Sequence, residues 1–108
     1  MTTISKNNQY ITFINVFKVD PSKQQELIDI LTKGTNNTVR FQDGFVSSVL
    51  HRSLDGTKVT MYAQWESQEL YNKMRDNVQA GEIFRDAIAI AQFDGGQYEV
   101  VEEFEFSR

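Results

Sequence analysis

Two alternating segments joined by a tight turn constrain the fold of this chain more than any other feature. Residues 45–54, FVSSVLHRSL, and residues 58–66, KVTMYAQWE, are rich in β-branched and aromatic residues and flank Asp55-Gly56. Asp-Gly between two such runs is a strong β-hairpin signal, because the favoured two-residue turns need residues that tolerate positive φ. The chain is therefore expected to contain an antiparallel sheet that other segments cover.

The amino-terminal third predicts one strand and one helix. Residues 10–19, YITFINVFKV, have the composition of a strand. A helix is predicted over residues 20–34, because Asp20 is a good N-cap and Pro21 suits the first helical position. Gly34 is a plausible end for this helix.

The carboxy-terminal third predicts two helical segments and a last strand. Ser67 is expected to cap the first helix, and residues 80–93 form the second, which Gly95-Gly96 would end. The apolar stripes of these helices are Leu70, Tyr71, Met74 and Val78 in the first, and Ile83, Phe84, Ala87, Ile88 and Ala91 in the second. Residues 97–106, QYEVVEEFEF, predict the closing strand.

The resulting order, β-α-β-β-α-β, is typical of the ferredoxin-like fold of the α+β class. In this fold one antiparallel four-stranded sheet carries its helices on one face. A length of 108 residues is that of a single domain, which we place at residues 10–108, after a polar N-terminal arm over residues 1–9.

The first strand is apolar on both of its faces. Phe13 and Phe17 share one face, while Ile14 and Val16 lie on the other. Two helices can cover only one face of a four-stranded sheet, so the second face needs another cover. A second copy of the chain, packed sheet to sheet, is the simplest cover, and we expect a homodimer with two-fold symmetry.

The composition argues against several classes of function. The net charge is −4 and no cluster of Lys or Arg occurs, so nucleic acid is an unfavoured partner. There is no cysteine and a single histidine, which disfavours disulfides and metal sites. No apolar run is long enough to span a membrane, and the first residues lack the apolar core of a signal peptide. We therefore expect a cytoplasmic protein.

Trp65 and Asn15 in the predicted strands, with Tyr71 after them, raise the question of a ligand pocket. Trp65, the only tryptophan, ends a strand, and Tyr71 follows six residues later. Either aromatic side chain could be core, or could form one wall of a ligand site. Asn15 lies between Phe13 and Phe17 on the same face, where an amide needs hydrogen-bond partners. Those partners are either backbone groups and water, or a ligand in a cavity between sheet and helices.

The segment GFVSSVLHRSLDGTKVTMYAQWES, with FINVFKVDPSKQQEL before it and ELYNKMRDNVQAGEIFRDA after it, resembles the antibiotic biosynthesis monooxygenase (ABM) domain family. The resemblance covers most of the chain and implies a dimeric α+β barrel. Some members oxygenate aromatic polyketides with O₂ and use no flavin, haem or metal, since the ionised substrate itself supplies the electrons. The resemblance thus implies a small aromatic substrate, O₂ and no cofactor.

The same resemblance implies roles for particular side chains. Trp65 and Tyr71 would shape the pocket, Tyr71 or His51 would accept a proton, and Arg85 would stabilise the substrate anion. These four are the implied catalytic residues. The implied substrate-binding residues are Asn15, Met61, Phe13, Phe17 and Met74. The four implied catalytic residues have plainer interpretations as well. Trp65 could be core and Tyr71 a flank of its helix stripe, while His51 and Arg85 could lie on the surface.

Met61 leaves two functions open. Quinone-forming members carry an asparagine four residues before the tryptophan, whereas this chain has Met61 there, and a thioether is only a weak acceptor. The chain is therefore either a cofactor-independent monooxygenase or a non-catalytic small-molecule-binding domain of the same fold. Haem degradation, the activity of another branch of the superfamily, is disfavoured. The position of that branch's axial histidine falls near Ile88 here, and that of its tryptophan falls near Met74, so no imidazole is available to bind haem iron.

The turn at Asp55-Gly56 decides where His51 lies. A two-residue turn pairs His51 with Thr60, on the opposite face of the sheet from Trp65. A three-residue loop with Gly56 in the left-handed conformation makes a bulge and puts both side chains on one face. Both geometries agree with the sequence.

Overall fold

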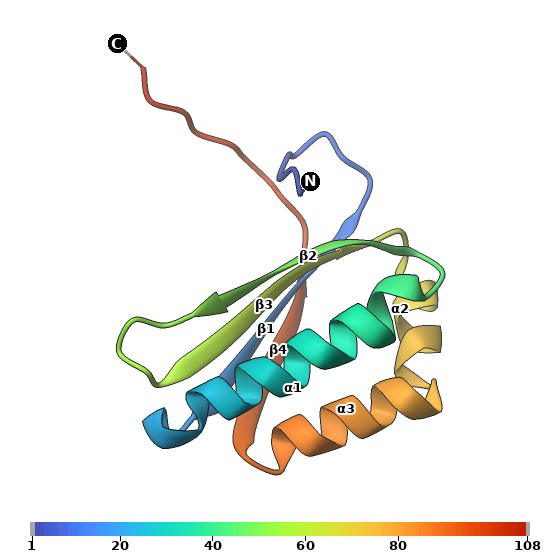
Figure 1. Cartoon of the computed structure of the whole chain (residues 1–108). Helices are drawn as coiled ribbons and strands as arrows, with labels where there is room; N and C mark the ends of the chain where they lie inside the picture. Colours follow the sequence, from blue (N-terminus) through green and yellow to red (C-terminus); the bar gives the residue numbers. More distant parts are fainter. Residues whose placement is uncertain (1, 108) are drawn as a thin grey trace.

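A single antiparallel sheet with helices on one face forms the body of the molecule (Figure 1). The computed structural model describes residues 2–107, and its strands lie in the order β2-β3-β1-β4. The elements are β1 (Ile11–Val19), η1 (Pro21–Lys23), α1 (Gln24–Asn37), η2 (Val39–Phe41), β2 (Phe45–Arg52), β3 (Lys58–Trp65), α2 (Gln68–Arg75), α3 (Val78–Ile88) and β4 (Ala91–Tyr98). This arrangement confirms the ferredoxin-like α+β fold.

The first helical segment begins as predicted but ends later. Asp20 Oδ1 accepts hydrogen bonds from the backbone N–H and the hydroxyl of Ser22, at 2.9 and 2.7 Å. The helix then continues past Gly34 to Asn37, so the expected end at Gly34 is wrong. Gly34 instead permits close helix packing, because a Cβ there would lie 2.6 Å from Ile83 Cγ2 of α3.

Two caps separate α2 from α3. Ser67 Oγ accepts a hydrogen bond from the Leu70 N–H at 3.1 Å, which confirms the predicted cap of α2. Asn77 Oδ1 accepts from the Ala80 N–H at 3.1 Å and begins a new helix. Val78 therefore starts α3 and is 73% exposed, so its predicted place on the α2 stripe is wrong.

The last strand was predicted in the wrong place. Helix α3 ends at Ile88, and β4 runs through Gly95 and Gly96, which were expected to end a helix. The segment AIAIA at residues 87–91 alternates in a way that suits either a helix or a strand. Pairing with β1 decides for the strand from Ala91, which lies opposite Val19.

Residues 99–107 were predicted to continue a strand and do not. Figure 1 shows them leaving the sheet as an extended tail, where Val101 and Phe104 are exposed. A strand is defined by its hydrogen-bonded neighbour, and among residues 2–107 no strand lies alongside this segment.

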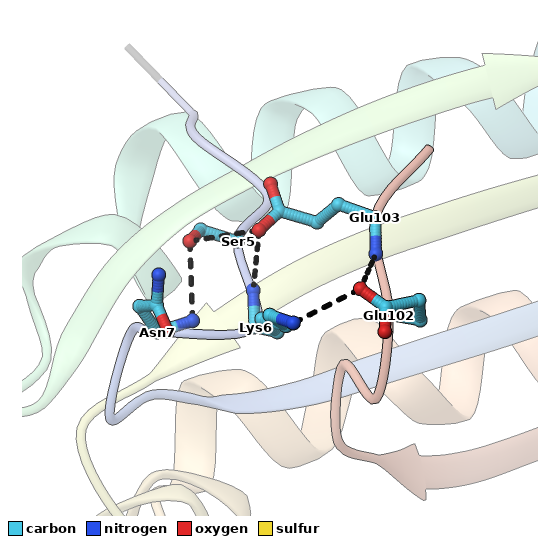
Figure 2. Close-up of polar contacts among 5 residues, drawn as sticks. All are labelled: Ser5, Lys6, Asn7, Glu102 and Glu103. Carbon is cyan, nitrogen blue, oxygen red and sulfur yellow. Dashed lines mark hydrogen bonds and ion pairs between the residues drawn. The ribbon is translucent and has the colours of Figure 1, made fainter. Parts of the chain in front are cut away.

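The N-terminal arm lies beside this tail (Figure 2). Lys6 Nζ is 3.0 Å from Glu102 Oε1, and this contact lowers the pKa of the Glu102 carboxyl. The Ser5 hydroxyl and the Lys6 N–H donate to Glu103 Oε2 at 3.4 and 3.3 Å. The arm also covers one polar side chain of the sheet, since Gln64 Nε2 donates to the Thr3 carbonyl at 2.7 Å.

The two faces of the sheet differ in their cover. The helix-covered face holds two clusters of buried side chains, centred on Phe17 and on Trp65. The other face, which we call the open face, points away from the helices. Its apolar side chains are half-buried or exposed and are Ile14, Val16, Val49, Tyr62 and Tyr98.

Candidate functional site: a cavity between sheet and helices

A cavity of about 100 Å³ lies between the covered face of the sheet and the helices. Most of its wall is apolar and includes Phe17, Met61, Ala63, Trp65, Met74 and Phe84. A few polar side chains also face it: Asn15, Thr35, Ser48, Tyr71 and Arg75. An apolar hollow with a few convergent polar groups is the usual form of a small-molecule site.

Trp65 is both core and cavity wall. It ends β3, is 1% exposed and pairs across the sheet with Ile11 and Phe45. The Phe45 ring meets it edge-on at 5.4 Å between centroids, and the Tyr71 ring does so at 5.5 Å. These perpendicular contacts are a favoured aromatic geometry and fix the orientation of the indole.

Tyr71 and Arg75 form the polar end of the cavity. They lie one turn apart on α2, and Arg75 Nη1 donates to the Tyr71 hydroxyl oxygen at 3.1 Å. Phe13 stacks on Tyr71 at 3.8 Å, and the Arg75 guanidinium carbon lies 4.2 Å from the Phe84 ring centroid. Because the phenol oxygen accepts from Arg75, its own O–H remains able to donate to a ligand.

The formal charge in the cavity wall is positive and comes from Arg75. Within residues 2–107, Arg75 is the only Asp, Glu, His, Lys or Arg side chain that lines it. Electrostatic attraction is stronger in apolar surroundings than in water, so a guanidinium there favours a negatively charged oxygen. The arrangement can therefore bind an anion, and the lining residues that the structure describes include no carboxylate or imidazole as a general base.

His51 and Arg85 lie outside this cavity. His51 pairs with Thr60 across the hairpin, on the opposite face from Trp65, and its Nδ1 is 3.4 Å from the Thr60 carbonyl oxygen. The register is that of the two-residue alternative, although residues 53–57 form the loop. Arg85 is exposed on α3. Their catalytic roles remain predictions that this placement does not support.

The hairpin loop is held by its own side chains. Asp55 Oδ1 accepts from the Thr57 hydroxyl and N–H at 2.7 and 3.0 Å, and from the Ser53 hydroxyl at 2.8 Å. These bonds, that from the Thr57 hydroxyl foremost, lower the pKa of Asp55 to about 2. Gly56 has a φ of +82°, which suits glycine.

The predicted substrate-binding residues are mostly brought together. Asn15, Phe17, Met61 and Met74 line the cavity, whereas Phe13 lies behind the Tyr71 ring. Sequence reasoning missed Arg75, although its spacing of four residues from Tyr71 places both on one helical face. It also missed the cavity residues Ser48, Thr35 and Phe93.

Among residues 2–107, no three His, Cys, Asp or Glu side chains gather in a group that could hold a metal ion. Within the same range, no helix combines the length and the apolar character that a membrane crossing needs.

Comparison with curated proteins finds a close relative. Tetracenomycin-F1 monooxygenase from Streptomyces glaucescens is 45% identical over 74 residues. The matched segment covers 68% of this chain and 66% of the length of that relative.

Solved structures share the fold over nearly the whole chain. A monooxygenase from the gene ActVA-Orf6 of Streptomyces coelicolor, in complex with Nanaomycin D, has a TM-score of 0.79 and 27% identity. The matched region covers 95% of this chain and 99% of the chain of that monooxygenase. SnoaB, a cofactor-independent oxygenase from Streptomyces nogalater, has a TM-score of 0.71 and 17% identity, over 89% of this chain and 97% of its own.

A family model matches residues 10–90, from just before β1 to the end of α3 and the turn after it. Its description is antibiotic biosynthesis monooxygenase. The match spans most of the sheet, all of the helices and nearly all of the cavity wall. The chain therefore belongs to the antibiotic biosynthesis monooxygenase family.

Proposed function

We propose that this protein is a monooxygenase that uses O₂ to oxidise a compact, electron-rich aromatic molecule, such as a phenol, anthrone or quinol, without a bound cofactor. The observation that carries the proposal is the apolar cavity in which Arg75, the one charged lining group among residues 2–107, hydrogen-bonds the Tyr71 hydroxyl. Support also comes from the relatives, one a tetracenomycin-F1 monooxygenase and another a cofactor-independent oxygenase.

In the proposed reaction the substrate binds as its phenolate or enolate. The negative oxygen lies at the polar end, where the Tyr71 O–H and the Arg75 guanidinium stabilise it. The anion gives electrons to O₂ and a carbon–oxygen bond forms. Loss of water from the resulting hydroperoxide leaves a carbonyl, so one oxygen atom enters the product and the other leaves as water.

Within the described range, residues 2–107, the cavity lining supplies no carboxylate or imidazole to take the phenolic proton. The proton therefore passes to solvent, and the guanidinium shifts the ionisation of the bound substrate in favour of the anion. The expected substrate is one that ionises readily. The protein contributes orientation, a dry environment and electrostatic stabilisation.

The size of the cavity limits the substrate. A volume of about 100 Å³ is smaller than the ~150 Å³ engineered cavity that binds benzene, so the cavity as it stands suits at most one ring. Fused rings need side chains to move, and Met61 and Met74 in the wall have the flexible side chains that allow this.

Oxygen uptake by metal-free protein tests the proposal. Wild type would be compared with Trp65→Phe and Met61→Asn on a panel of hydroquinones, naphthols and anthrones. Uptake above the buffer rate that falls in Trp65→Phe is the expected result. Silence of wild type across the panel, with normal folding by circular dichroism, would contradict it.

A non-catalytic binding domain is the second candidate, and Met61 favours it. Met61 lines the cavity and replaces a polar group with a thioether, which suits an apolar ligand that is bound but not oxidised. In that case Met61→Asn would gain oxygen uptake that wild type lacks, while wild type would still bind aromatic molecules.

We further propose that the protein is a homodimer in which two open faces pack together. Five apolar side chains lie on this face without the cover of a helix: Ile14, Val16, Val49, Tyr62 and Tyr98. A contiguous apolar surface of this kind is typical of a protein–protein interface. A second copy would bury both surfaces by symmetry.

A further inference from the structure

We infer that the substrate enters the cavity between helix α1 and strand β2, past Thr35 and Ser48, and that Arg40 at the mouth of this path attracts the anion. The inference rests on the proposed function, because it concerns how the proposed phenolate or enolate reaches that cavity. It gives a part in substrate selection to an exposed residue that does not line the cavity itself.

Two further hollows adjoin the cavity on the side of α1 and β2. The inner hollow, of about 160 Å³, shares Met61 with the cavity wall. The outer hollow, of about 350 Å³, reaches the surface at Asn36 and Arg40, which are exposed. Thr35 of α1 and Ser48 of β2 line the cavity and both hollows, so the three spaces meet at this pair. A path from the surface to the cavity therefore runs between two small side chains.

The gap between α1 and β2 is held together on one side of this path. Among residues 2–107, one side-chain hydrogen bond joins the helix to the strand, from Arg52 Nη2 to Gln25 Oε1 at 2.6 Å. That bond lies at the end of β2 next to the hairpin loop, beyond Ser48. In the same range of residues, no side-chain hydrogen bond joins the two elements at Thr35 and Ser48. Rotation of these side chains therefore widens the path without breaking a polar contact between α1 and β2.

A second candidate path, between α2 and the segment after η2, is narrower. A hollow of about 40 Å³ lies there and shares Met74 with the cavity wall. Met74 is 7% exposed and belongs to the buried cluster around Trp65, so this path opens only if a core side chain moves. The exposed residues at its mouth are Asp43 and Lys73, whose opposite charges do not favour an anion.

Arg40 gives the mouth between α1 and β2 a positive charge. Its Nη1 donates to Asn36 Oδ1 at 3.4 Å, and neither ion pair of residues 2–107 involves it. The charge is therefore available to attract an anionic ligand, on a chain whose net charge is −4. The attraction continues inward to Arg75, the positive group of the cavity wall.

Binding rates with a blocked mouth test the path. The chain has no cysteine, so Asn36→Cys can be labelled at one site with N-cyclohexylmaleimide. Asn36 lines both hollows but not the cavity, so the adduct obstructs the path and leaves the binding site unchanged. Lys33→Cys with the same label is the matched control, since Lys33 is exposed on α1 and lines neither hollow.

The probe is para-nitrophenolate, an anion with a single ring that is too electron-poor to be oxidised readily. It absorbs light where tryptophan emits, so stopped-flow quenching of Trp65 emission follows its binding in the cavity. The adduct at residue 36 should lower the association and dissociation rate constants together, by ~5-fold or more, and leave Kd within about 2-fold. The Lys33→Cys adduct should keep the wild-type rates.

Removal of the charge at the mouth tests the role of Arg40. Arg40→Gln should lower the association rate constant of para-nitrophenolate ~3-fold at low ionic strength, and this difference should vanish in strong salt. The rate for para-nitroaniline, a neutral molecule of the same shape, should not change. Lys33→Gln is the matched control, because it removes a positive charge from α1 away from the mouth and should leave the rate for the anion near that of wild type.

The possible results separate this inference from the proposed function. Rates unchanged by the adduct at residue 36 would overturn the path between α1 and β2, and rates slowed by a Lys73→Cys adduct instead would assign entry to the mouth at α2. An equal effect of Arg40→Gln on the anion and on para-nitroaniline would overturn the role of Arg40. In each case the probe still binds and the proposed function stands. If para-nitrophenolate did not quench Trp65 at any concentration, the cavity would not be a site for an aromatic anion and both proposals would fall.

Discussion

The two faces of strand β1 show how cover, rather than composition, decides what a surface does. On the covered face Phe13 and Phe17 are 3% and 4% exposed; Phe17 lines the cavity, and Phe13 stacks on Tyr71 of its wall. On the open face Ile14 and Val16 are comparably apolar but only half-buried. Helices of the same chain close the first face, whereas the second would be covered by another copy in the proposed dimer.

The largest effect is expected from breaking the covered face at Trp65. Trp65→Ala removes a side chain that is 1% exposed and leaves a void, which should lower the free energy of unfolding by ~3–5 kcal/mol. Urea denaturation followed by circular dichroism measures it. The control is Leu54→Ala at a fully exposed position, expected within ~0.5 kcal/mol of wild type. Equal losses would contradict the assignment of Trp65 to the core.

A charge on the open face should separate the proposed dimer. Ile14→Lys with Val16→Lys would bury two ammonium groups in the interface, and we expect the dimer dissociation constant to rise at least ~100-fold. Sedimentation equilibrium measures the mass. Lys33→Glu on exposed α1 is the control and should leave the dimer intact. A monomeric wild type would refute the dimer.

The two arginines sharpen the contrast between the cavity and its surroundings. Arg75→Met should lower kcat/KM for a phenol that the wild-type protein oxidises by ~10–100-fold, because the change removes a charged hydrogen-bond donor from the site. Arg85→Met is the matched control and should stay near wild type, since Arg85 is exposed outside the cavity. If Arg85→Met lost more kcat/KM than Arg75→Met, the substrate anion would be bound by Arg85, as the sequence resemblance implies, and not by Arg75.

The smallest effect is expected at the hairpin loop, away from both faces. The pKa of Asp55 falls from 3.8 to about 2 on folding, so its contribution to stability is present above pH 3.8 and is lost as the pH falls through about 2. The stability difference between wild type and Asp55→Asn should therefore shrink over this window. Acid titration of unfolding curves measures it, and a difference that is constant with pH would contradict the lowered pKa.

The sequence was most informative where local chemistry and pattern agreed. The hairpin, the first strand and the Ser67 cap were predicted from residues whose preferences are local. The strand β4 was not, because the Ala-Ile alternation suits two periodicities and only pairing with β1 selects one. Here tertiary contact overrode the helical interpretation.

The site was predicted in part for the same reason. Trp65, Tyr71 and Asn15 stood out by type and spacing, and all three line the cavity. Arg75 was within reach, since it follows Tyr71 by one helical turn. The side on which His51 lies could not be known in advance, because it depends on the length of a loop and not on the histidine itself.

Because the side of the sheet on which His51 lies depends on loop length, a change in the length of this loop could alter the cavity wall during evolution. Because β2 and β3 alternate, the register set by residues 53–57 sends Ser48 and Leu50 toward the helices and His51 away. Gain or loss of one residue in this loop would shift the pairing and exchange the two sets of side chains. A single insertion would thus turn the His51 imidazole toward the helices together with the rest of its set, whereas one substitution changes only one side chain.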